Sequence, residues 1–100
     1  MAKVKVANAN DLKSGERKVV TANGKTLALF NVNGKFYAIE NACLHRGGPL
    51  GEGSLEGNIV TCPWHGFQYD VTSGQCLTNP SLKEKSYPVE VNGEDVYVDA

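Results

Sequence analysis

The chain has 100 residues, 41% hydrophobic and 21% charged, and this composition indicates a single globular domain spanning residues 1–100. A formal net charge of −1 argues against nucleic acid as a partner, because phosphate recognition needs a basic surface. The apolar runs are too short to span a membrane, and the N-terminus lacks the apolar stretch of a signal peptide. We therefore expect a cytoplasmic protein without a membrane partner, and its three cysteines are expected to be reduced.

The N-terminal residues predict a short strand followed by a loop. Val4 and Val6 alternate with lysines, and this period of two is typical of a strand. Residues 8–15 are polar and turn-forming, so we expect a loop there, with one helical turn capped by Asn10.

Two Asn-Gly pairs, Asn23-Gly24 and Asn33-Gly34, punctuate the most strand-like part of the chain. Both residue types tolerate positive φ and favour two-residue hairpins. The pairs separate three segments that are expected to form an antiparallel meander: residues 16–21, 26–32 and 35–40. The middle segment is the most apolar and is predicted to be a central strand.

Short strand patterns continue to the C-terminus, where a third Asn-Gly pair, Asn92-Gly93, predicts another hairpin. The expected strands cover residues 58–62, 67–71, 87–91 and 95–98. No stretch keeps a helical period over three turns. The fold class is therefore predicted to be all-β, as an antiparallel sandwich or small barrel.

The metal-binding side chains are concentrated in two short segments. Cys43 and His45 form a Cys-x-His pattern, and Cys62 and His65 form Cys-x-x-His, with sixteen residues between His45 and Cys62. Packing alone does not explain this concentration in Gly- and Pro-rich segments, so we predict a metal site built from two facing loops. Cys76, the third cysteine, matches no ligand position and is expected to be a small, partly buried residue.

The distribution of thiols and imidazoles narrows the choice of metal. Mononuclear zinc is one alternative, but zinc motifs usually keep the cysteines together and the histidines together. Here each segment supplies one of each, which suits a binuclear centre with thiolates on one metal and imidazoles on the other. Rieske 2Fe–2S centres divide their ligands in this way. A chance arrangement without a metal is the remaining alternative at this point.

The two segments closely resemble those of the Rieske family. Their spacing and their flanks, Arg46-Gly47-Gly48-Pro49-Leu50 and Trp64-His65-Gly66-Phe67, are similar to those of the soluble Rieske-type ferredoxins of bacterial ring-hydroxylating oxygenases. The resemblance covers most of the chain. It implies a Rieske-type antiparallel sandwich with a cluster-binding subdomain formed by two loops, at about residues 42–82.

The resemblance also implies one 2Fe–2S cluster and the residues that hold it. Cys43 and Cys62 would bind one iron, and His45 and His65 would bind the other. Two ferric ions, two sulfides and two thiolates sum to about zero charge when the imidazoles are neutral. Trp64, beside the ligands, would be either part of the core or part of a docking surface around the cluster.

The function implied by the resemblance is that of a one-electron carrier, not an enzyme. The chain, expected to be a monomer, would accept electrons from a flavin-dependent ferredoxin reductase and deliver them to a terminal oxygenase through transient docking. Nothing in the sequence resembles a substrate-processing site. The alternative is a small Rieske-like subunit of an assimilatory nitrite reductase. Many of those subunits have lost ligands, whereas this chain keeps all four.

Overall fold

The computed structural model describes residues 3–42, 49–64 and 66–100. Within these residues the chain forms β-strands and two short 3₁₀ turns, and no α-helix. In chain order the elements are β1 (Lys3–Asn8), η1 (Ala9–Asp11), β2 (Arg17–Ala22), β3 (Lys25–Val32), β4 (Lys35–Glu40), η2 (Leu50–Glu52), β5 (Ser54–Glu56), β6 (Ile59–Thr61), β7 (Gln68–Asp70), β8 (Ser86–Tyr87), β9 (Val89–Asn92) and β10 (Asp95–Asp99). No helix among the described residues has the length and apolar character needed to cross a membrane. The predicted all-β class is confirmed.

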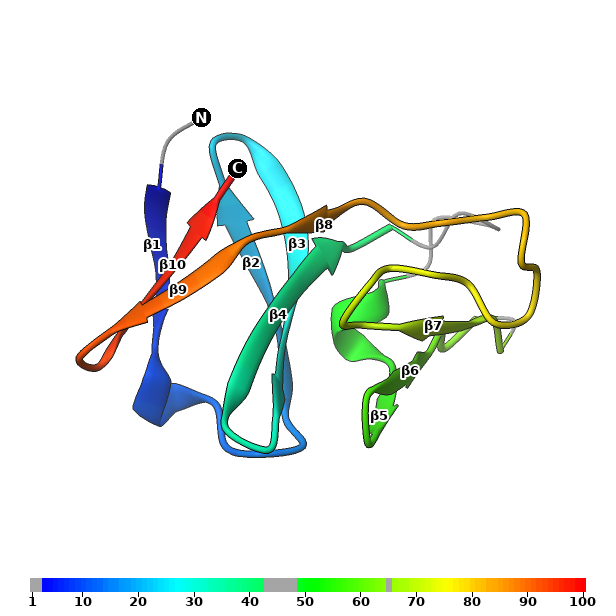
Figure 1. The fold of residues 1–100 in the computed structure, drawn as a ribbon, viewed down its shortest axis with the longest axis horizontal. Coiled ribbons are helices and arrows are strands. Elements are labelled where there is room, and N and C mark those ends of the chain that lie inside the picture. Colours follow the sequence, from blue (N-terminus) through cyan, green and yellow to red (C-terminus); the bar gives the residue numbers. More distant parts are fainter. Residues whose placement is uncertain (1–2, 43–48, 65) are drawn as a thin grey trace.

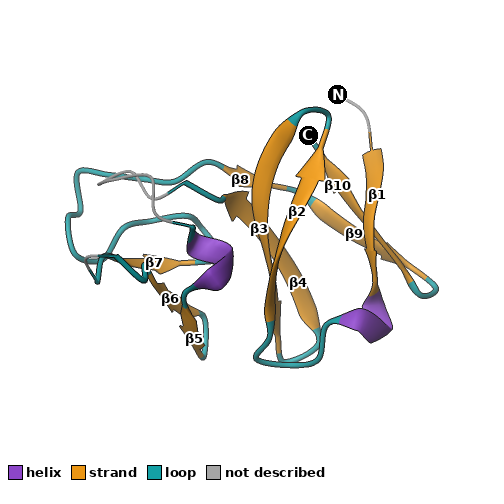
Figure 2. Ribbon diagram, turned by 180° about the vertical axis from the view of Figure 1, so that it is seen from behind, coloured by secondary structure: helices purple, strands orange, loops and turns teal. Residues whose placement is uncertain are grey.

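The strands form three antiparallel sheets, with the orders β1-β10-β9, β2-β3-β4-β8 and β5-β6-β7. Figures 1 and 2 show the first two sheets packed against each other, while the small third sheet lies to one side of them. The predicted meander is the β2-β3-β4 part of the second sheet, and β3 is a central strand as expected. The antiparallel sandwich predicted from the sequence is confirmed.

Strand β3 contributes side chains to two separate hydrophobic cores, one on each of its faces. Its side chains from Leu27 to Phe30 are fully buried, and successive side chains of a strand point to opposite faces. Leu27 and Leu29 therefore join a core between the two larger sheets, whereas Ala28 and Phe30 join a second core on the side of the third sheet. A strand that is buried on both faces must be apolar almost throughout, which explains the composition of β3.

The two cores divide the buried apolar residues between them. The sandwich core contains Ala7, Leu12, Val20, Ala22, Leu27, Leu29, Ala38, Tyr87, Val96, Val98 and Ala100. The second core contains Ala28, Phe30, Ile39, Leu50, Val60, Cys62, Tyr69, Val71 and Cys76. Two of the three cysteines thus lie in the second core, on the side of the predicted cluster.

The three Asn-Gly pairs do not all make the same turn. Asn23-Gly24 and Asn33-Gly34 have positive φ at both residues (50° and 75°, then 52° and 90°), the pattern of a type I′ hairpin. At the third pair, Asn92 is the last paired residue of β9, and it lies opposite Asp95. The turn residues are therefore Gly93 and Glu94, of which only Gly93 has positive φ, at 65°. The hairpin predicted over Asn92-Gly93-Glu94 is confirmed, and within it Asn92 extends β9, so that Gly93 and Glu94 alone form the turn.

The strand expected over residues 87–91 is in fact two strands in different sheets. Tyr87 ends β8 and pairs with Ala38 of β4, whereas Val89 begins β9 and pairs with β10. Pro88 lies between them, and it has no N–H to donate to a ladder. Its carbonyl accepts the N–H of Asp99 at 3.0 Å. The chain therefore passes from one sheet to the other at this proline.

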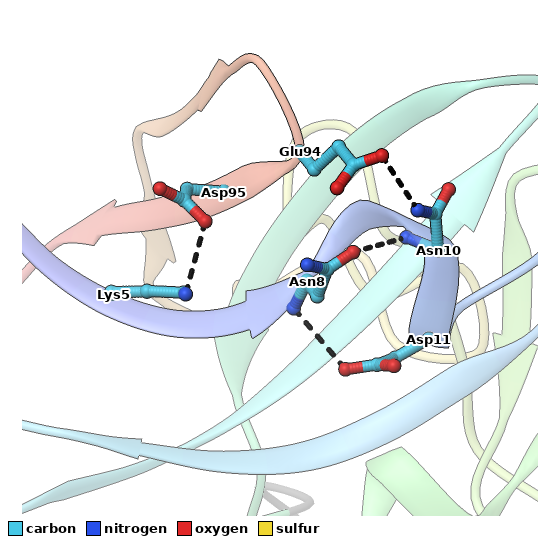
Figure 3. Close-up of polar contacts among 6 residues, drawn as sticks. All are labelled: Lys5, Asn8, Asn10, Asp11, Glu94 and Asp95. Carbon is cyan, nitrogen blue, oxygen red and sulfur yellow. Dashed lines mark hydrogen bonds and ion pairs between the residues drawn. The ribbon is translucent and has the colours of Figure 1, made fainter.

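The predicted helical turn after β1 is present as η1, but its cap is Asn8 and not Asn10. The Asn8 side chain accepts the N–H of Asn10 at 2.9 Å, and the Asp11 carboxylate accepts the N–H of Asn8 at 3.3 Å, which completes a capping box (Figure 3). The side chain of Asn10 instead donates to Glu94 at 3.0 Å and ties this turn to the β9–β10 hairpin.

Candidate metal centre

Of the four predicted ligands, only Cys62 lies in the part of the chain that the structure describes. Cys43, His45 and His65 lie outside the described residues. The structure does describe the residues on either side of the first predicted ligand segment (residues 43–48). It also describes Cys62 and Gly66, at the two ends of the second segment. These flanking residues test the prediction of two facing loops.

The first ligand segment begins and ends at neighbouring positions. Ala42 and Pro49 form an isolated antiparallel bridge. The N–H of Leu50 donates to the carbonyl of Asn41 at 2.8 Å, and the N–H of Gly51 donates to the Asn41 side chain, also at 2.8 Å. Two neighbouring residues are thus held by a single asparagine. These bonds close the base of the first segment.

The second ligand segment begins at the end of β6. The N–H of Cys62 donates to the carbonyl of Phe67 at 2.7 Å, and the N–H of Gly66 donates to the carbonyl of Cys62 at 3.1 Å. Gly66 has a φ of +75°, a conformation that glycine adopts without strain. The two hydrogen bonds close the base of the segment and return the chain to β7.

The two loop bases are brought together at Gly53. A Cβ on this glycine would lie 2.1 Å from the carbonyl oxygen of Thr61 and 3.3 Å from that of Leu50. Leu50 follows the first segment, and Thr61 directly precedes Cys62. Leu50 and Cys62 also share the second core. The structure therefore places the bases of the two segments next to each other, as facing loops require.

The environment of Cys62 fits an iron–sulfur cluster. Its residue is 2% exposed and lies among apolar side chains, and Phe67 packs against the same core. A dry, apolar surrounding suits such a centre because it limits the access of water and helps to set the potential. No group of three or more His, Cys, Asp or Glu that could hold a metal ion is found among the described residues.

Cys76 is a residue of the second core and is 1% exposed, so it is more deeply buried than the partial burial predicted from the sequence. It lies opposite Tyr69 in an isolated bridge, and its Sγ accepts the N–H of Asn79 at 3.3 Å. Trp64, in contrast, is 57% exposed and so belongs to the surface beside Cys62.

A buried carboxyl group lies at the junction of the second core and β8. Glu84 is 2% exposed, and its Oε2 is buried without a hydrogen-bond partner in the described part of the molecule. Burial, and secondly the charge of Glu40, raise the pKa of Glu84 to about 8. Glu40 itself accepts the hydroxyl of Tyr87 at 2.5 Å.

We expect the free energy of unfolding to fall as the pH rises from about 4.5 to about 8, because the folded state keeps the Glu84 proton where the unfolded chain has lost it. Glu84→Gln should remove this pH dependence and stabilise the fold at pH 8 by about 2 kcal/mol. We expect less than the full shift implies, because local opening admits water to the carboxylate. Thermal unfolding at pH 5 and pH 8 measures the effect. Glu90→Gln, at an exposed carboxylate paired with Lys3, is the control. Equal pH dependence in the wild type and Glu84→Gln would contradict the expectation.

The fold defines an all-β protein, and the Cys-x-His and Cys-x-x-His segments of its sequence indicate an iron–sulfur protein. The chain belongs to the Rieske [2Fe-2S] domain family, whose profile matches residues 2–93. It is 38% identical over 90 residues to the ferredoxin component of the naphthalene 1,2-dioxygenase system of Pseudomonas aeruginosa, covering 89% of this chain and 86% of that protein.

Solved structures agree with this assignment. A chain in the complex of reduced oxygenase and oxidized ferredoxin in carbazole 1,9a-dioxygenase is 35% identical, with a TM-score of 0.89, and the match covers 96% of this chain and 91% of that chain. A candidate small subunit of an NADPH nitrite reductase matches with a TM-score of 0.86 over 100% of both chains, but at 24% identity this likeness shows the fold alone.

These findings confirm the family and the cofactor that the sequence predicts. The cofactor of the domain is one Rieske-type 2Fe–2S cluster, which supplies reversible one-electron chemistry when bound. The assignment of Cys43, His45, Cys62 and His65 as its ligands stays a prediction.

Proposed function

We propose that this chain is a one-electron carrier that takes electrons from a flavin-dependent ferredoxin reductase and delivers them to a terminal oxygenase. The observation that carries the proposal is the likeness, over nearly the whole of both chains, to a chain in a complex of oxygenase and ferredoxin. The relative from the naphthalene dioxygenase system is likewise named as a ferredoxin component. In this function the chain is a redox partner and not an enzyme.

We infer that four residues hold the cluster, with Cys43 and Cys62 on one iron and His45 and His65 on the other. The burial of Cys62 and the adjacent bases of both segments support this assignment. We also infer that residues 1–100 are a single domain whose cluster-binding part covers about residues 42–82. Most of the second core comes from this part of the chain, which supports that division: Leu50, Val60, Cys62, Tyr69, Val71 and Cys76.

The surface next to Cys62 offers apolar contacts to a partner. Trp64 is 57% exposed and Leu77 is 48% exposed. The Leu77 N–H donates to the carbonyl of Gln68, so Leu77 lies beside the turn that carries Trp64. A few exposed apolar side chains suit the small, transient interface of an electron carrier. We propose that the chain acts as a monomer in the cytoplasm and docks by this surface to the reductase and the oxygenase in turn.

The alternative, a small subunit of an assimilatory nitrite reductase, has weaker support. The structural match of that description is 24% identical, whereas the relative from the naphthalene dioxygenase system is 38% identical. The four predicted ligands favour a redox role over a purely structural one.

Electron paramagnetic resonance of the reduced protein tests the proposed function. We expect a spectrum with an average g value below that of an all-cysteine cluster, because imidazole nitrogens replace two thiolates. In a mixture with NADH, a flavin-dependent reductase and the oxygenase of a naphthalene dioxygenase system, the cluster should be reduced and then reoxidised by the oxygenase. An all-cysteine spectrum, or obligate co-purification with a siroheme enzyme, would refute the proposal.

A further inference from the structure

Residues 77–81 are all exposed, so burial of side chains does not hold them in place. Hydrogen bonds define their path instead. The N–H of Asn79 donates to the buried Sγ of Cys76 at 3.3 Å, and the N–H of Ser81 donates to the Asn79 side chain at 3.1 Å. The N–H of Leu82 then donates to the carbonyl of Asn79 at 3.0 Å. Such a network gives an exposed segment one defined shape.

The segment is the tip of a narrow hairpin formed by residues 74–84. Gln75 and Lys83 are bridged, and the hydrogen bonds on either side of them join Cys76 N–H to the Leu82 carbonyl (3.1 Å) and Glu84 N–H to the Gly74 carbonyl (2.7 Å). With few backbone bonds in so short a hairpin, its tip depends on additional contacts from side chains.

The side chain of Gln75 supplies the largest of these contacts. Its Nε2 donates to the carbonyl oxygens of Pro80 and Leu82, each at 3.0 Å, and lies 3.3 Å from that of Cys76. An amide nitrogen carries two protons, so the two shorter bonds account for both of them. The amide thus connects the start of the hairpin with the far side of its tip. Pro80 has no N–H of its own to donate, so its carbonyl is the one backbone group through which residue 80 can be hydrogen-bonded.

The tip lies directly beside the turn that carries Cys62. Gln68 accepts the N–H of Leu77 at its carbonyl (2.7 Å), and its own N–H donates to the Thr78 hydroxyl (2.9 Å). The preceding residue, Phe67, accepts the N–H of Cys62. Figure 1 shows the long loop that follows β7 at the same end of the molecule as the turn between β6 and β7. Segment 77–81 therefore lies against this turn.

We propose that Gln75 is a positioning residue of the redox site, and that its amide holds segment 77–81 against the Cys62 turn and thereby limits the access of water to the cluster. The inference rests on the proposed role of Cys62 as a ligand. The oxidised cluster has a net charge of about zero and the reduced cluster about −1. Water stabilises the reduced cluster more than the oxidised one, because the reduced cluster has the larger charge. Loosening segment 77–81 should therefore favour reduction.

The test is the midpoint potential of the cluster-loaded Gln75→Met variant, measured against redox mediators. Methionine keeps the length of the side chain and removes both donors. We expect reduction to become about threefold more favourable, which is about 28 mV at 59 mV per tenfold for one electron. Hydrogen exchange of the Ser81 and Leu82 amides should become at least about tenfold faster, because opening of the tip exposes them to water.

Gln68→Met is the matched control. Among the described residues the Nε2 of Gln68 contacts only Thr61, at 3.4 Å. Gln68 is hydrogen-bonded to segment 77–81 through its backbone, which the substitution leaves in place. This variant should keep the potential and the exchange rates of the wild type. Equal potentials in Gln75→Met, Gln68→Met and the wild type would overturn the proposal. Fast exchange at Ser81 and Leu82 in the loaded wild type would also overturn it, even if Gln75→Met did not bind the cluster. Neither result would affect the electron-carrier function, which would instead fail if the wild type lacked a mixed-ligand cluster.

Discussion

Cys62→Ser is expected to abolish the 2Fe–2S cluster, whereas Cys76→Ser should leave it in place. Iron in such clusters is held by thiolates, and a serine hydroxyl is far harder to deprotonate than a thiol. Cys62 lies where the two loop bases meet, so its loss removes a donor from the proposed site. We expect the iron content per chain to fall about tenfold or more, by analogy with the loss of a metal-site residue.

The two cysteines make a closely matched pair. Both are buried, with 2% and 1% of Cys62 and Cys76 exposed, and both lie in the second core. The same substitution therefore introduces the same hydroxyl into the same core. At Cys76 the hydroxyl can still accept the N–H of Asn79, so we expect a cost of no more than about 1 kcal/mol there.

Iron content, visible absorption and the electron paramagnetic resonance spectrum of the two purified variants measure the difference. A Cys62→Ser protein with a full cluster would remove Cys62 from the ligand set. Loss of the cluster in Cys76→Ser, with a fold that is otherwise intact, would mean that the sequence pattern points to the wrong thiol.

The parts of the fold that were predicted correctly depend on local chemistry. The hairpins at Asn23-Gly24 and Asn33-Gly34 follow from the tolerance of these residues for positive φ, and the strands between them follow from apolar patterning. The spacing of Cys43, His45, Cys62 and His65 likewise indicated the family and its cofactor without any structure.

The errors arise where tertiary contacts decide between local alternatives. Asn8 and Asn10 have the same capping side chain, and the pairing of β1 with β10 extends the strand to Asn8, so that the helical turn begins directly after Asn8. A proline after Tyr87 could have marked an edge strand, but here the chain changes sheets at this point. The sequence also gives no sign that Gln75 reaches the carbonyl of Pro80, because that contact exists only once the hairpin has formed.

Gly53 is a further position that sequence patterning alone could not interpret. Its φ of −76° is available to every residue, so nothing in its backbone conformation requires glycine. Its requirement is steric, since a Cβ would lie 2.1 Å from the Thr61 carbonyl oxygen. Neither Thr61, in β6, nor Leu50, in η2, can move aside without separating the two loop bases.

Gly53→Ala is therefore expected to destabilise the fold by about 2 to 3 kcal/mol, as overpacking does in a well-packed site, and to lower the iron content as the loop bases separate. Gly57→Ala is the matched control, because Gly53 and Gly57 flank β5 on either side. Gly57 has a φ of +62°, and a Cβ on it would meet no atom within 4 Å, so alanine there introduces backbone strain without a clash. We expect that strain to cost about 1 kcal/mol and to leave the cluster bound.

Iron per chain and thermal unfolding of both variants separate the two effects. If Gly53→Ala kept full iron and matched Gly57→Ala in stability, the close approach at Thr61 would not be what holds the ligand segments together.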